Sequence, residues 1–138
     1  MLSIFAQGIF IFDPVTGNKQ PFTIIDKEVN ERLCLHGNTV NVYRNTPNTI
    51  LLLGNHVYCY HLKEKQFSIV SEEKGINIIE GSLKAIACDG HSTYLNDIKH
   101  VYELDNHSNR LRVLFTAQDD MNINSVSMDE SGLFLDRE

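Results

Sequence analysis

The segment from Cys88 to Ser92 holds residue types that nucleophilic catalysis would need. It reads Cys-Asp-Gly-His-Ser, which places a thiol, a carboxylate, an imidazole and a hydroxyl close together. Adjacent residues on a strand point to opposite faces, however, so His91 cannot easily hydrogen-bond Ser92. We interpret His91 as a structural side chain that hydrogen-bonds between strands. Asp89 and Asp129 occupy similar positions and are expected to cap tight turns.

No other pattern indicates an enzyme. The sequence has no nucleophile-elbow, phosphate-loop or dinucleotide-binding motif. A catalytic site in a central channel would require His91, Asp89 and Asp129 to line one pocket. We therefore predict a protein that is not an enzyme and has no cofactor, with a hydrolase or lyase as the alternative.

Six histidines raise the question of a metal site. Their spacings form no zinc-binding motif, so we expect exposed histidines in turns and no bound metal. A repeated fold could still bring His61 and His107 near each other, because both fall in similar turns.

The five tyrosines are better candidates for function, because tyrosine is enriched in the cores of protein interfaces. Tyr58 and Tyr102 recur in register and are expected in the core, whereas Tyr60 and Tyr94 have no counterpart. We predict partner binding at Tyr60, Tyr94, His61 and His107. Packing between repeated units is the alternative for the two tyrosines.

These residues lie on a repeated pattern of short apolar runs. Residues 42–70 resemble residues 86–114 at an offset of 44, with Val57-Tyr58 matching Val101-Tyr102 and Leu51 matching Leu95. A third copy begins at Val126 with an offset of 40, and the first residues of the chain supply a matching second half. Repetition at this period indicates an array in which each unit packs on its neighbours.

Within a unit the apolar residues recur with a period of two, which predicts strands rather than helices. Polar turn formers such as Gly54-Asn55 and Asn96-Asp97 separate them. Residues 26–34 could be a helix or a charged loop. The clearest unit predicts four strands, at Leu83–Cys88, Thr93–Leu95, Val101–Leu104 and Leu111–Phe115. Four-stranded antiparallel units of about 44 residues are typical of β-propeller blades, so we predict an all-β fold of that kind over residues 1–138.

The offsets of 48, 44 and 40 sum to 132, so the chain corresponds to three units, one of them divided between its ends. Propellers typically have four to eight blades. Three interpretations follow: a fragment of a longer propeller, a homodimer that makes a six-bladed ring, or a module completed by another protein. Unpaired sheet edges recruit partners, which disfavours an open monomer.

The unit from Ile86 to Leu95, followed by Val101-Tyr102 and Asp105-Asn106, resembles the regulator of chromosome condensation repeat. In that family an Ala-Cys or Ala-Ala step, a His-Ser pair and a Val-Tyr strand follow one another. This chain lacks the glycines that flank the Val-Tyr strand. The resemblance implies a regulator of a small GTPase or a chromatin-associated factor. No exchange residues carry over. Residues 124–135 also resemble the first two strands of a WD-type repeat, although the chain has no Trp.

Composition limits the classes of partner and compartment. The chain has 138 residues, 42% of them hydrophobic, and a net charge of −6. An acidic chain without clustered Lys or Arg is poorly suited to nucleic acid or to anionic membranes. Three cysteines without a CxxC motif, and no signal peptide or membrane span, favour an intracellular location, cytoplasmic or nuclear. We predict a protein-interaction scaffold that binds a protein partner or a second copy of itself.

Overall fold

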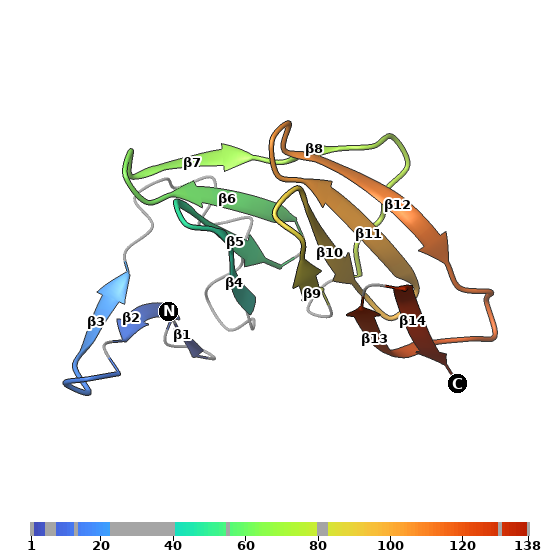
Figure 1. Cartoon of the computed structure of the whole chain (residues 1–138), viewed down its shortest axis with the longest axis horizontal. Helices are drawn as coiled ribbons and strands as arrows, with labels where there is room; N and C mark the ends of the chain where they lie inside the picture. Colours follow the sequence, from blue (N-terminus) through green and yellow to red (C-terminus); the bar gives the residue numbers. More distant parts are fainter. Residues whose placement is uncertain are drawn as a thin grey trace.

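The computed structural model describes residues 2–4, 8–12, 14–22, 41–54, 56–79, 83–129 and 131–137. These residues form an all-β structure of mostly antiparallel sheets, which confirms the predicted class (Figure 1). The described part of the chain contains no helix that could cross a membrane. The segment 26–34, where a helix or a loop was expected, lies outside the described residues.

The first central sheet is an antiparallel meander in which each strand pairs with the next in the chain. The turns between its strands are short and polar, as expected for exposed hairpin ends. Its strands are β4 (Asn41–Thr46), β5 (Thr49–Leu53), β6 (Val57–His61) and β7 (Gln66–Ile69).

The second central sheet has the same strand order, with one addition at its outer edge. Its four antiparallel strands differ from the predicted bounds by no more than one residue. They are β9 (Lys84–Cys88), β10 (Ser92–Asn96), β11 (His100–Asp105) and β12 (Arg110–Thr116). After β7 the chain passes at once to this sheet, where β8 (Ser71–Glu72) pairs with β12 in parallel.

Two smaller sheets contain the first and last described strands (Figure 1). The first sheet contains β1 (Leu2–Ile4), β2 (Gly8–Phe12) and β3 (Lys19–Phe22), and the last contains β13 (Ile123–Asp129) and β14 (Gly132–Arg137). The sequence predicts that the two ends share one unit. Among the described strands no pairing joins these two sheets. Strand β4 contacts β9, and β9 contacts β13, so the opening strands of the last three sheets are neighbours.

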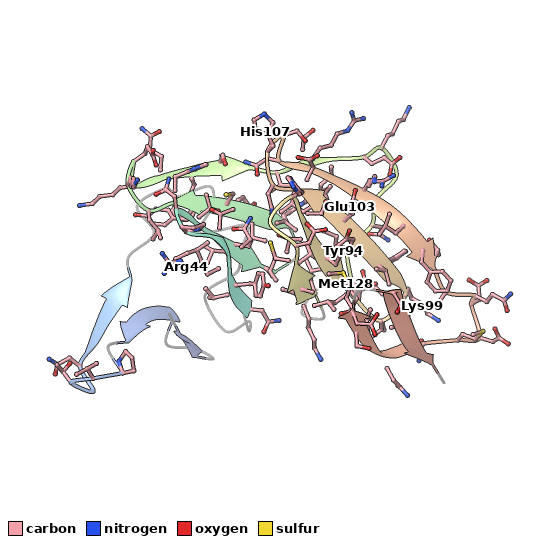
Figure 2. All side chains as sticks on the ribbon, viewed as in Figure 1. Arg44, Tyr94, Lys99, Glu103, His107 and Met128 are labelled. Atoms are coloured by element: carbon pink, nitrogen blue, oxygen red, sulfur yellow. The ribbon has the colours of Figure 1, made fainter. Side chains whose placement is uncertain are left out.

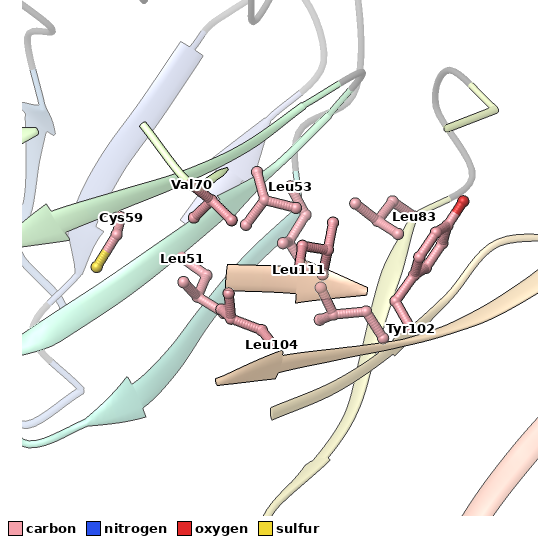
Figure 3. Packing of buried hydrophobic residues seen from close by; sticks show 10 residues of the cluster. Leu51, Leu53, Cys59, Val70, Leu83, Tyr102, Leu104 and Leu111 are labelled. Atoms are coloured by element: carbon pink, nitrogen blue, oxygen red, sulfur yellow. The ribbon is translucent and has the colours of Figure 1, made fainter. Parts of the chain in front are cut away.

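The main hydrophobic core lies between the two central sheets (Figure 3). Because alternate residues of a strand face the same side, Leu51 and Leu53 point from β5 toward the second sheet. Leu104 and Leu111 pack against them from the second sheet and are fully buried. A polar seam accompanies this core, in which Asn45 Nδ2 donates to Asn106 Oδ1 at 3.0 Å.

The strand registers of the two central sheets differ in one respect from the predicted alignment of their sequences. In the first sheet Leu52 lies opposite Tyr58, and in the second sheet Leu95 lies opposite Tyr102. The structural counterpart of Leu95 is therefore Leu52, 43 positions earlier, and not Leu51 as the sequence alignment has it. The tyrosines remain 44 apart because the turn between β10 and β11 is one residue longer than the turn between β5 and β6.

Candidate partner-binding face

The second sheet turns one face toward the first sheet and the other toward β13 and β14. Tyr94 and Glu103 lie directly opposite each other on β10 and β11 and belong to the second face. At one end Val101 packs with Ala117 and Ile123 in a small buried cluster. Elsewhere the cover is incomplete, and Leu114 on β12 is 38% exposed.

Lys99 fixes the connection that carries β13 and β14 to this face. Its Nζ donates to the carbonyl oxygens of Gln118, Asp119 and Met121 in the segment between β12 and β13. Ile123 N donates to the carbonyl oxygen of Ile98 at 2.8 Å. The two-stranded sheet is thereby held beside the second sheet without covering all of it.

The uncovered part is an open cleft of about 640 Å³ between the second sheet and the hairpin of β13 and β14. Figure 2 labels Glu103, Tyr94 and Met128 along this face. Its walls combine apolar side chains with carboxylates: Tyr94, Leu114, Met128, Asp89, Glu103 and Asp129. The arrangement can hold an apolar group and a positive charge together.

Backbone N–H groups donate to both aspartates of the cleft. The N–H groups of Ser92 and His91 donate to Asp89 Oδ1 at 2.8 and 2.9 Å, and these bonds lower the pKa of the Asp89 carboxyl. Asp129 Oδ1 accepts from the N–H of Ser131 at 2.7 Å. Both aspartates thus cap turns, as the sequence predicts, and both are exposed.

Tyr94 experiences the negative field of the cleft. Its pKa is raised, first by burial and then by the charges of Asp89 and Glu103. Glu103 also accepts a hydrogen bond from Arg112 Nε at 2.8 Å. That guanidinium is 58% exposed, so the ion pair lies at the edge of the face.

The four residues predicted to bind a partner lie in different places. Tyr94 lines the cleft. Tyr60 is half-buried and packs against Phe67, with ring centroids 4.7 Å apart. His61 Nε2 lies 3.0 Å from Ser68 Oγ, which also accepts a hydrogen bond from Asn109 Nδ2.

His107 is exposed and lines a separate hollow with His91 and Thr46. His91 lies in the turn before β10 rather than on a strand. Among its described lining residues, the cleft with Asp89 and Asp129 has no histidine. Within the described residues, no group of three or more His, Cys, Asp or Glu side chains could hold a metal ion.

Cys88, considered above as a nucleophile, belongs to the polar seam between the central sheets. Its thiol donates to the carbonyl oxygen of Asn45 at 3.2 Å and accepts from Asn106 Nδ2 at 3.3 Å. Thr93 Oγ1 donates to Asn106 Oδ1 at 2.7 Å. These contacts place Cys88 in a hydrogen-bonded network between the central sheets.

A second polar cluster surrounds Asp97, which is 1% exposed, in the turn between β10 and β11. Tyr102 OH donates to Asp97 Oδ2 at 2.7 Å, and the N–H groups of Lys99 and His100 donate to Oδ1. His100 Nδ1 lies 3.0 Å from the same Oδ1. Burial, followed by the Asp97 hydrogen bond, raises the pKa of Tyr102.

Sequence reasoning missed Glu103, Leu114 and Met128 as members of a site. One signal was available for Glu103, because its counterpart in the first sheet is the buried Cys59. A charged residue where the other unit has an apolar one marks a face with a different environment. Comparison of the sequence with protein-family models and with curated proteins found no match.

Proposed function

We propose that the chain is a non-catalytic protein-interaction module of the β-propeller type, completed by a partner protein or by a second copy. One observation carries the proposal: two strands, β13 and β14, cover only part of the second sheet's outer face. A propeller sheet normally packs against a neighbouring sheet on each side. The repeated strand order of the two central sheets supports the propeller type.

The sheet edge supports the same conclusion. Among the described strands, β14 pairs only with β13, which leaves its other edge able to accept a strand. Strand addition to such an edge is a common mode of protein recognition, because the main chain supplies the hydrogen bonds.

Two measurements together test the proposal: the mass of the protein in solution and the rate of amide hydrogen exchange. Light scattering on a sizing column should give either twice 15.7 kDa, which supports a second copy, or a monomer that awaits another protein. The informative β14 amides are those that point away from β13, since the others already bond β13 within the hairpin. In the monomer these outward amides should exchange fast, and in the dimer slowly. A monomer in which these outward amides exchange slowly would overturn the proposal, because the edge would already be covered within the chain.

A further inference from the structure

The cleft beside β14 has an apolar floor that a partner could cover. Tyr94 and Met128 are half-buried, and Leu114 is one of the few large hydrophobic side chains exposed in the described part of the chain. Burial of such surface is favourable at about 25 cal/mol per Å². An occupant should therefore bring aliphatic carbon to the middle of the cleft.

The rim of the cleft is acidic on two sides. Asp89 stands at the turn before β10, and Asp129 at the turn between β13 and β14, and both are exposed. Glu103 adds a third carboxylate, already paired with Arg112 at the outer edge. Among the described lining residues none is basic. A cation that can reach both turns would complement the negative charge of this rim.

We propose that this cleft binds an arginine side chain presented by an extended segment of a partner protein. Arginine fits better than lysine, since its flat guanidinium can stack on the Tyr94 ring and hydrogen-bond a carboxylate with two N–H groups. Its methylenes would cover Leu114 and Met128. The inference rests on the proposed function, because it names the chemistry of the partner that the open face receives.

Three labelled peptides test it by fluorescence anisotropy at physiological salt. The first peptide alternates arginine and leucine. The other two are matched controls that carry lysine or glutamate in place of arginine. We expect the arginine peptide to bind at least about tenfold more tightly than the glutamate peptide, and more tightly than the lysine peptide. Equal affinity for all three would overturn the inference, and equal affinity for arginine and lysine would overturn the choice of arginine.

A charge-matched pair of variants locates the binding. Asp129→Asn keeps the oxygen that accepts the Ser131 N–H but removes the charge, and it should weaken arginine-peptide binding about fivefold. Asp120→Asn removes the same charge from an exposed turn outside the cleft and should leave the affinity unchanged. Equal effects of the two variants would indicate attraction by net charge alone and would overturn the site. Circular dichroism confirms that both variants fold.

The two proposals fail in different ways. If the peptide does not bind and the chain is a dimer with protected outward β14 amides, the cleft inference fails and the interaction module stands. If the peptide does not bind and a monomer shows protected outward β14 amides, both fail. Peptide binding that is weakened in Asp129→Asn but not in Asp120→Asn supports both.

Discussion

The two central sheets share one strand order, but the faces that they turn away from each other differ. In the first sheet Ile50 and Leu52 on that face are 6% and 0% exposed, and Tyr58 is fully buried. In the second sheet Tyr94 and Glu103 are only half-buried, and Leu114 is 38% exposed. Among the described residues, the outer face of the first sheet is therefore buried, whereas the outer face of the second sheet is partly open.

The turns between the second and third strands differ as well. Three residues separate the paired Leu53 and Val57, but four separate Asn96 and Val101. The longer turn contains Asp97, whose carboxylate accepts hydrogen bonds from the Tyr102 hydroxyl and from three backbone N–H groups, those of Ile79, Lys99 and His100. One extra residue therefore supplies the second sheet with a buried polar anchor at the place where the first sheet has a short turn.

The largest expected effect separates the two faces of the second sheet. Leu104→Ala removes a fully buried side chain of the main core and should lower the free energy of unfolding by about 3 kcal/mol. Leu114→Ala, on the open face, should cost less than about 1 kcal/mol. Urea denaturation followed by circular dichroism measures both. Similar losses would mean that the open face is as tightly packed as the core.

The anchor at Asp97 should give the next largest effect. Asp97→Ala leaves the Tyr102 hydroxyl and the N–H groups of Lys99 and His100 without their acceptor, at a cost of about 2 kcal/mol. Asp120→Ala, in an exposed turn, is the control and should change stability by less than about 0.5 kcal/mol. A small loss in both would show that the longer turn does not depend on its carboxylate.

The stability of the protein at alkaline pH should test the interaction of Tyr102 with Asp97. The pKa of Tyr102 in the folded protein is raised above the ordinary 10.0, so the unfolded chain releases the phenol proton first. This stabilisation is complete below pH 10 and declines as the pH rises, by about 1.4 kcal/mol at pH 11. Urea titrations at several pH values should show a shallower decline for Tyr102→Phe. Identical declines in the two proteins would contradict the assignment.

The smallest effect concerns two hairpin turns that are alike in backbone but differ in sequence. Lys65 and Asn109 occupy corresponding positions before β7 and β12, and both have positive φ, 54° and 55°. Asn tolerates this conformation better than Lys does. Lys65→Asn should therefore stabilise the protein by about 0.5 kcal/mol in thermal denaturation. A loss would indicate that the lysine side chain contributes to the turn.

The sequence predicted the strands of the second sheet closely, because period-two apolar runs with polar turns specify strands almost locally. It did not predict β8, since Ser71–Glu72 has no apolar alternation and pairs only through its backbone. The sequence also aligned Leu51, rather than Leu52, with Leu95. Both leucines are apolar, so the sequence pattern does not show that the second sheet has one more residue in its turn. The repeat and the ring type stay predictions.

The candidate site was predictable only in part. Tyr94, which lines the cleft, was selected because it has no aromatic counterpart in the other unit, and its contact with a partner stays a prediction. Its neighbours Met128 and Asp129 come from a different sheet, and no local pattern reports which sheets pack together. Tyr60, His61 and His107 remain predictions for partner contact, since their positions do not test them.

The strand order also governs how the chain folds during its synthesis. Almost every described strand pairs with its neighbour in sequence, so each hairpin can form soon after its residues emerge. The first central sheet ends at Ile69, but Leu51 and Leu53 are covered only when residues as late as Leu111, 42 positions on, are present. At about 5–20 residues per second, that interval lasts roughly 2 to 8 s. A nascent chain would expose an apolar sheet for that time, long enough for a ribosome-associated chaperone to bind it.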